Sequence, residues 1–302
     1  MLTRRGFLKF VFRGAVAMAA LAGFPVVEAM AAPRITRYQL TPPRWTPGLK
    51  LKIVALADFH ACDPWMTAAR IKAICDRANA LNPDIILLLG DYASGMNAVL
   101  DYVHSRDWSA AMAGLSAPLG VHAIMGNHDY WEDKSFQRDP TIETFGEKAL
   151  SNVGIPVYVN RSIRLEKDGF PFWLAGLGDQ AALLPSKALN RRWMRGIDDL
   201  PATLAQVTDE APIVLLAHEP DVFADISDKP PRISLTLSGH THGGQINLFG
   251  WTPIVPSRYG SRYIGGHIVE NGNHIIVSQG LGCSGLPIRF GSWPEILEID
   301  LG

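Results

Sequence analysis

The chain has 302 residues, of which 47% are hydrophobic and 19% are charged. This length is ordinary for one large α/β domain, and the composition allows a sizeable core and argues against intrinsic disorder. The net charge at pH 7 is −1, which gives no electrostatic basis for a nucleic-acid partner.

Residues 1–31 have the pattern of an export signal. A twin arginine in the run TRRGFLK is followed by an apolar stretch over residues 14–27, and Ala29-Met30-Ala31 fits the small-x-small site of a signal peptidase. The basic start resembles a twin-arginine signal. We therefore expect contact with the twin-arginine export machinery and a location in the periplasm or on the outer face of the cytoplasmic membrane.

An uncleaved N-terminal anchor is the alternative to cleavage. The apolar stretch is shorter than the roughly 20 residues that a membrane span needs, so cleavage after residue 31 is favoured. The leader carries four basic residues and one acidic residue, which leaves a net charge of −4 on the remaining chain. Residues 32–302 are then expected to form a single domain.

The three cysteines of the remaining chain, Cys62, Cys75 and Cys283, form no disulfide framework and no CxxC metal pair. A bridge between Cys62 and Cys283 is conceivable in an oxidising compartment. Small buried thiols are the preferred interpretation.

Short apolar runs alternate with helical patterns in the first half of the chain. An edge strand is expected at Ile35–Leu40, and buried strands at Leu51–Ala57 and in DIILLLGD and GVHAIMGNHD. Helices are expected over residues 66–82, around Ala98–Leu115 and over residues 141–153.

Strands dominate the second half. They are expected within residues 155–180 and in APIVLLAHEPD, ISLTLSGHTH and WPEILEIDL, with a hairpin around Asn271-Gly272. No internal repeat, low-complexity segment or linker interrupts the pattern. One α/β domain built on a layered sheet sandwich is the simplest architecture.

Polar residues suited to chemistry follow the predicted strands. The ends of five successive strands carry Asp58 and His60, then Asp91, then Asn127, His128 and Asp129, then His218, and finally His240 and His242. Sites in open α/β sheets form at the carboxyl ends of the strands. The order therefore predicts one site at one sheet edge.

Aspartate oxygens and histidine nitrogens without thiolates favour Mn, Fe or Zn. The ligands are too many for one tetrahedral ion, so two divalent ions with one shared carboxylate are expected. Two metals roughly 3.5–4 Å apart clamp the attacking and leaving oxygens of a displacement at phosphorus. Water bound to such ions has a pKa lowered to about 7, so hydroxide is available without a protein base.

The order D-x-H, G-D, G-N-H-D, H, G-H-x-H resembles the calcineurin-like metallophosphoesterase superfamily. The resemblance implies a four-layer α-β-β-α sandwich of two mixed sheets flanked by helices. It implies a first metal held by Asp58, His60 and His242, a bridging Asp91, and a second metal held by Asn127, His218 and His240. In an extended backbone, residues two apart point the same way, so His240 and His242 are expected to reach different ions.

The same resemblance implies catalytic roles for His128 and Asp129. His128 would contact the phosphate and protonate the leaving oxygen, and Asp129 would orient His128 through its other ring nitrogen. Attack on phosphorus by a metal-bound hydroxide is the implied mechanism. Purple acid phosphatases are disfavoured because their metal-bound tyrosine position, three residues after the bridging aspartate, is Ser94 here.

The runs GHTHGGQINLFG, SQGLGCSGLPIRF and PEILEIDL look like the small bacterial cell-envelope branch of this superfamily. That branch includes exported phosphoesterases and hydrolases of the lipid precursor UDP-diacylglucosamine. The leader favours an exported phosphohydrolase acting on a phosphomonoester or phosphodiester, with the lipid-precursor hydrolase as the alternative. A non-catalytic scaffold is a distant third, because no ligand of the pattern is missing.

Residues 249–263 are rich in aromatic residues and arginine. They could line a substrate, with aromatics against an apolar group and arginines against phosphate. They could also contact a membrane surface, which would suit a lipid or cell-envelope substrate. An irregular loop packed on the sandwich edge is the competing interpretation.

Overall fold

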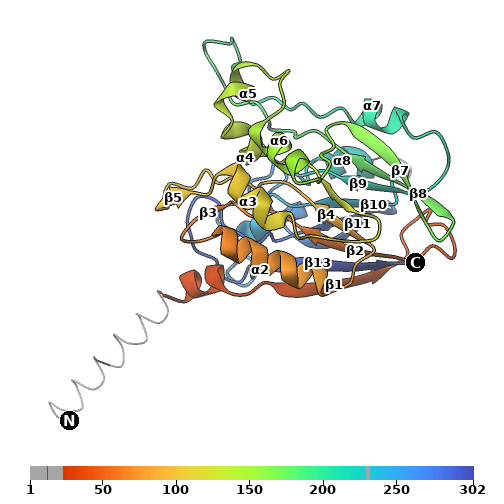
Figure 1. Ribbon diagram of the computed structural model, residues 1–302, viewed down its shortest axis with the longest axis horizontal. Coiled ribbons are helices and arrows are strands. Elements are labelled where there is room, and N and C mark those ends of the chain that lie inside the picture. Colours follow the sequence, from red (N-terminus) through yellow and green to blue (C-terminus); the bar gives the residue numbers. More distant parts are fainter. Residues whose placement is uncertain (1–11, 13–22, 229–231) are drawn as a thin grey trace.

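The computed structural model describes residues 12, 23–228 and 232–302, and its core is two mixed β-sheets (Figure 1). The first sheet has the order β1-β13-β2-β4-β6, and the second has the order β11-β12-β10-β9-β8-β7. The first consists of β1 (Arg34–Leu40), β13 (Glu295–Leu301), β2 (Leu51–Leu56), β4 (Ile85–Leu88) and β6 (Val121–Ala123). The second consists of β11 (Gly266–Glu270), β12 (Asn273–Val277), β10 (Leu235–Ser238), β9 (Ile213–Leu216), β8 (Phe170–Gly176) and β7 (Arg161–Lys167).

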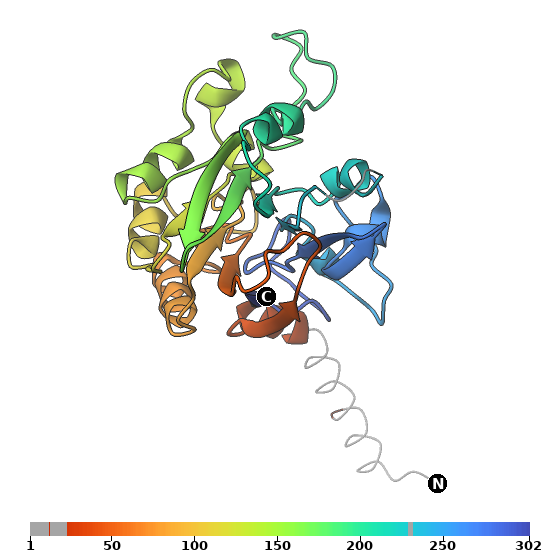
Figure 2. The same ribbon diagram turned by 90° about the vertical axis from the view of Figure 1, so that its right-hand side faces the viewer.

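Helices cover the outer face of each sheet, as the two sides of the molecule in Figure 2 show. The first sheet is covered by α2 (Ala68–Asn79), α3 (Ser105–Met112) and α6 (Phe145–Asn152), and the second by α7 (Leu200–Ala205) and α8 (Val222–Ser227). Three buried clusters fill the three spaces between these layers. The predicted four-layer α-β-β-α sandwich is confirmed.

The sequence of strand β2 is apolar on both faces because both faces are buried. Val54 and Leu56 pack under the helices of the first sheet, whereas Ile53 and Ala55 face the second sheet. All four side chains are fully buried. A strand between two apolar layers loses the alternation of a half-exposed strand.

Most predicted elements are present, including the edge strand β1 and the hairpin of β11 and β12. The helix expected around Ala98–Leu115 is shorter, because only Ser105–Met112 is helical. The preceding β5 (Asp101–Tyr102) instead pairs with β3 (Cys62–Asp63) in a small separate sheet. The domain also contains the short helices α4 (Asn127–Trp131) and α5 (Lys134–Arg138) and the 3₁₀ turns η1 (His242–Gly244) and η2 (Gly260–Tyr263).

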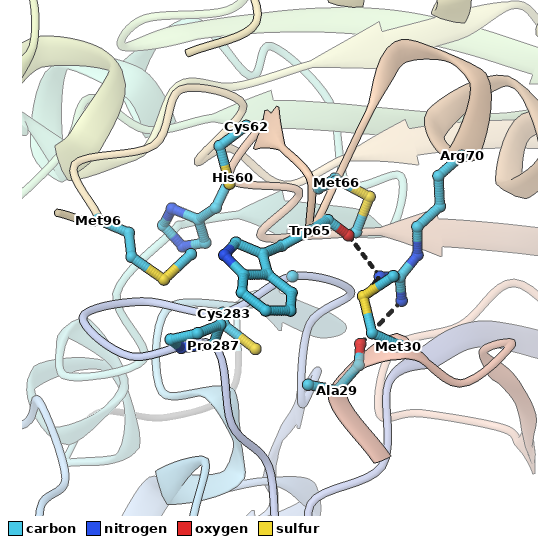
Figure 3. Close-up of a pocket in the computed structure, with 11 residues that line it drawn as sticks. Ala29, Met30, His60, Cys62, Trp65, Met66, Arg70, Met96, Cys283 and Pro287 are labelled. Carbon is cyan, nitrogen blue, oxygen red and sulfur yellow. Dashed lines mark hydrogen bonds between the residues drawn. The ribbon is translucent and has the colours of Figure 1, made fainter. Parts of the chain in front are cut away.

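Residues 23–30 form a helix whose last turn packs on the domain. Arg70 donates to the carbonyl oxygen of Ala29, which is buried, at 2.9 Å (Figure 3). It also donates to the carbonyl oxygen of Ala31 at 3.2 Å. The backbone N–H of Gly291 donates to Glu28 Oε2 at 3.1 Å. The predicted signal-peptidase site therefore lies inside a folded contact, while the twin arginine falls outside the described residues and cleavage stays a prediction. Across the part of the chain that is described, no helix combines the length and apolarity of a membrane span.

The three cysteines are buried free thiols, so the conceivable Cys62–Cys283 bridge is not formed. Burial raises the pKa of the Cys62 and Cys283 thiols. They pack with Ala29 and Met96 in one small apolar cluster, which fits the preferred interpretation of structural cysteines.

Candidate metal centre and active site

The structure brings the residues that follow the five strands together at one edge of the two sheets. Each of three groups has its ligand atoms within 4.8 Å of one another. The groups are Asp58 with His60 and His242, Asp91 with His218 and His240, and His60 with Asp91 and His128.

Asp91 lies between the first two groups. Its Oδ2 is 3.4 Å from His60 Nε2 and 3.2 Å from His218 Nε2. Asn127 Oδ1 lies 2.8 Å from His240 Nδ1, which adds the amide to the second group. This is the arrangement that a shared carboxylate between two ions requires.

The donor atoms fit divalent metal ions. Asp58 Oδ2 is buried and has no hydrogen-bond partner among the described residues, and such an atom costs about 1–3 kcal/mol if nothing else satisfies it. The remote nitrogens of two rings face carbonyl oxygens: His60 Nδ1 lies 3.1 Å from Ala93 O, and His218 Nδ1 lies 2.7 Å from Leu89 O. A proton on each Nδ1 leaves the Nε2 lone pair free for a metal.

Electrostatics favour the ligand form of most of these groups. Burial lowers the pKa of His60 to about 3 and, helped by His60 and Arg289, holds the pKa of His242 well below its usual range. Burial opposes ionisation of Asp91, yet the surrounding histidines, His218 foremost, hold its pKa well below the ordinary value. The site therefore offers neutral imidazoles at His60 and His242 beside a charged central carboxylate at Asp91.

Two groups hold protons in the absence of a metal. Burial raises the pKa of Asp58 to about 7. Burial lowers the pKa of His218, but the carboxylates of Asp91 and Asp58 outweigh it and raise that pKa well above the usual value. A positive ion beside these atoms would displace both protons.

Backbone strain is concentrated in the site. Five of the seven predicted metal ligands have left-handed backbones, with φ between 48° and 71°: Asp58, His60, Asp91, His240 and His242. Each such residue costs about 1–3 kcal/mol unless the surrounding structure enforces it. The expectation of an extended backbone at His240 and His242 is thus wrong, because both residues turn. They nevertheless lie in different groups, as expected.

Gly126 allows the second group to close. A Cβ at this position would meet Asp91 Oδ1 at 2.4 Å and His218 Cε1 at 2.7 Å. Any larger residue would push one of these side chains away. The glycine of the G-N-H-D run is therefore a packing requirement of the site.

His128 stands at the open side of the cluster, on the first turn of α4. Its backbone N–H donates to Asp91 Oδ1 at 2.9 Å, and its Nε2 lies 3.4 Å from Ser284 Oγ. Nδ1 is 3.6 Å from Glu132 Oε1. Burial lowers the pKa of His128, but Asp91 and Glu132 outweigh it and raise the pKa above the ordinary value. A protonated imidazole at this place can donate to a departing oxygen.

Asp129 does not orient His128, so the role expected from the sequence is wrong. Its Oδ1 accepts from the N–H groups of Tyr92 and Ala93, and its Oδ2 from those of Asp91 and Gly126, all at 2.9 Å. Both oxygens are thus used on backbone donors. Asp129 fixes the turn that carries Asp91 against the start of α4, and it is a positioning residue.

Arg289 is a residue of the site that sequence reasoning did not single out. It is fully buried, and its guanidinium donates to the carbonyl oxygens of Gly282, Gln279 and Ser292. Its Nη2 lies 3.1 Å from His242 Nδ1. Arginine is almost never fully buried without partners, but its sequence context, LPIRF, carries no signal of that burial.

Two grooves lead away from the metal-ligand cluster. One, of about 640 Å³, begins at His240 and is lined by Trp131, Glu219 and Asp221. The other, of about 320 Å³, begins at His242 and runs between Ile254 and Leu286. A phosphoester at the cluster therefore has room for a substituent on either side.

Comparison with known proteins agrees with this geometry. The family model of the calcineurin-like phosphoesterases matches residues 51–244. The uncharacterized metallophosphoesterase YkuE of Bacillus subtilis is 33% identical over 83% of this chain and 78% of its own, and the phosphodiesterase YaeI of Escherichia coli is 29% identical over 83% and 82%. A zebrafish transmembrane protein with a metallophosphoesterase domain is 29% identical over 94% of this chain, which spans 60% of that relative.

These bacterial relatives are consistent with the small bacterial branch that the sequence motifs indicate. The family model covers all five predicted strand ends, from Asp58 to His242. The chain belongs to the calcineurin-like phosphoesterase family, and it is a metal-dependent phosphoester hydrolase.

Proposed function

We propose that this protein is an exported phosphohydrolase that uses two divalent ions to hydrolyse a phosphomonoester or, preferentially, a phosphodiester. The observation that carries the two-ion site is the position of Asp91 Oδ2 between histidines of both ligand groups. The preference for a diester rests on the name of the E. coli relative, a phosphodiesterase, and on the two grooves that leave the cluster.

Asp58, His60 and His242 would hold one ion, and His218, His240 and Asn127 the other. Bound there, the ions supply neutralisation of phosphate charge and a water-derived nucleophile at neutral pH. His128, with its raised pKa, donates a proton to the departing oxygen. Ser284 Oγ, 3.4 Å from His128 Nε2, lies where a phosphate oxygen can be bound.

The function is tested with two chromogenic substrates, a nitrophenyl phosphodiester and the matching monoester. We expect metal-dependent turnover of the diester after reloading stripped protein with Mn²⁺, and no turnover by Asp91→Asn. The exposed acid Asp107, on α3, provides the control variant Asp107→Asn, which should keep wild-type rates. Protein that binds two equivalents of metal and turns over neither substrate would refute the proposal.

Export rests on the leader sequence and has its own test. The variant Arg4→Lys with Arg5→Lys keeps the charge of the leader but removes the twin arginine. We expect the wild-type chain in the periplasmic or membrane fraction and the variant in the cytoplasmic fraction. Equal distribution of the two would contradict use of the twin-arginine route.

A further inference from the structure

A set of exposed apolar side chains, here called the apolar rim, lies beside the second of the two grooves. It consists of Phe24, Val27, Phe249, Trp251, Ile254 and Leu286, each at least 45% exposed. Monomeric proteins rarely leave a contiguous apolar surface without a partner. The rim combines residues from three distant parts of the sequence, which the fold brings near one another.

The three parts are joined by contacts. The ring of Phe24 lies 5.8 Å from that of Phe290 in an edge-on arrangement. The N–H of Phe290 donates to Gln245 O at 2.9 Å, and the N–H of Asn247 donates back to Phe290 O at 2.6 Å. The helix of residues 23–30 is thereby coupled to the strand-like segment that leads to Phe249.

Phe249 is at the tip of a tight turn that points it away from the domain. The N–H groups of Leu248 and Trp251 donate to each other's carbonyl oxygens at 2.8 and 3.1 Å, which closes a two-residue turn. Phe249 and Gly250 both have positive φ, at 56° and 97°. Phe249 is 103% exposed. A strained turn that presents a fully exposed aromatic ring has no stabilising role in the isolated domain.

The groove connects the rim to the metal-ligand cluster. His242 lies at its inner end, and Ile254 and Leu286 belong both to its wall and to the rim. The later part of the same segment is built differently, because Tyr263 is buried and Arg262 pairs with Glu270 at 2.8 Å. Residues 249–263 were expected either to line a substrate or contact a membrane, or to pack on the sandwich edge. The end of the segment packs on the sandwich, whereas its beginning does not.

In the chain that keeps its leader, which is the alternative to cleavage, residues 14–27 indicate what covers the rim. The sequence from Gly14 to Val27 contains no charged residue and is preceded by four basic residues, a pattern that partitions into lipid with its basic end at the headgroups. This run ends in the helix that carries Phe24 and Val27. Trp is enriched at membrane–water interfaces, and Trp and Phe are typical of the apolar faces that lie in such an interface.

We propose that the apolar rim docks on a lipid bilayer and that the substrate is a membrane phospholipid, whose apolar part enters the groove beside His242. This inference rests on the proposed phosphohydrolase function. In the reaction a water oxygen forms a bond to phosphorus, one P–O ester bond breaks, and the departing alkoxide takes a proton. No co-reactant besides water is needed.

Docking is tested by fluorescence quenching with the full chain and vesicles of phosphatidylglycerol that carry bromine on the acyl chains. The leader is present in every variant, so any anchoring by it is the same. We expect brominated vesicles to quench wild-type tryptophan fluorescence and Trp251→Phe to lose the quenched fraction. The control Trp193→Phe removes a tryptophan of similar exposure from another loop, because Trp193 is 71% exposed and Trp251 is 63% exposed. This control variant should keep the quenched fraction of the fluorescence. Equal quenching in the two variants would overturn the docking.

The substrate class is tested with phosphatidylglycerol vesicles labelled in the headgroup glycerol, compared with the soluble chromogenic diester. We expect Phe249→Asp to lower release of the label at least about tenfold, Phe249→Leu to retain it, and both variants to turn over the soluble diester at wild-type rates. Wild-type protein that hydrolyses the soluble diester but leaves the vesicle lipid intact would overturn the inference alone. Failure on both substrates would refute the proposed function instead. A lipid-free dimer that Phe249→Asp disperses would show that a second copy covers the rim, which also overturns the inference.

Discussion

Replacing Asp129 by asparagine separates the role seen in the structure from the role expected from the sequence. The carboxylate accepts four backbone N–H groups, two on each oxygen. Asparagine keeps one oxygen and turns an NH₂ group toward the other two donors. A buried donor left without an acceptor costs about 1–3 kcal/mol, so the variant should lose about 2–6 kcal/mol of unfolding free energy. This is a large part of the 5–15 kcal/mol typical of a domain.

The assay is urea unfolding followed by circular dichroism, together with metal content and turnover. With an m-value of about 3 kcal/mol/M, a loss of about 4 kcal/mol lowers the midpoint by roughly 1.3 M. We also expect weaker metal binding, because the turn that carries Asp91 is no longer fixed. Glu132→Gln, at the residue that directly follows α4 and 3.6 Å from His128 Nδ1, is the matched control and should unfold within about 0.5 kcal/mol of wild type. An Asp129→Asn variant with normal stability and full metal content but a reduced turnover rate would refute the reasoning and restore an orienting role toward His128.

Three further outcomes follow from the site. His128→Ala should keep both metals, measured by elemental analysis, and lose about 10²–10⁴-fold in turnover; loss of metal would make His128 a ligand. Gly126→Ala should fold but bind metal weakly, because its Cβ would lie 2.4 Å from Asp91 Oδ1, and normal calorimetric affinity would contradict this. Affinity for Zn²⁺ should fall between about pH 8 and pH 6, because Asp58, with a pKa of about 7, and His218, with a raised pKa, are protonated at the lower pH and must release those protons. Calorimetry in buffers of different ionisation heat measures the protons released, and pH-independent affinity would be the opposing result.

The sequence alone predicted the sheet layers and the edge where the site lies. Residues such as Val54 and Ile53 are apolar because opposite faces of β2 are both covered, and that pattern is local enough to read without coordinates. Polar residues such as Asp58 and His218 directly follow these apolar runs, so they were predicted to lie at the strand ends. The order of these residues also carried the family resemblance.

Short elements were harder to predict because their stability is not local. Residues 101–102 pair with β3, nearly forty residues earlier in the chain, so no periodicity marks them. Residues 23–30 look like leader in composition, yet Arg70 and Gly291 hold their last turn on the domain. Both features depend on partners distant in sequence.

The sequence by itself therefore determined which residue types lie at the end of each strand. The burial and the direction of a strand depend on residues that are close in sequence, so both can be predicted from it. The tertiary structure alone decided the partners of the site residues. Asp129 faces four amides because the turn at Asp91 and the start of α4 meet there, and Arg289 stands behind His242 because the loop after β12 folds over it. The left-handed turns at the ligands and the exposed ring of Phe249 likewise depend on packing, since isolated residues avoid that backbone conformation.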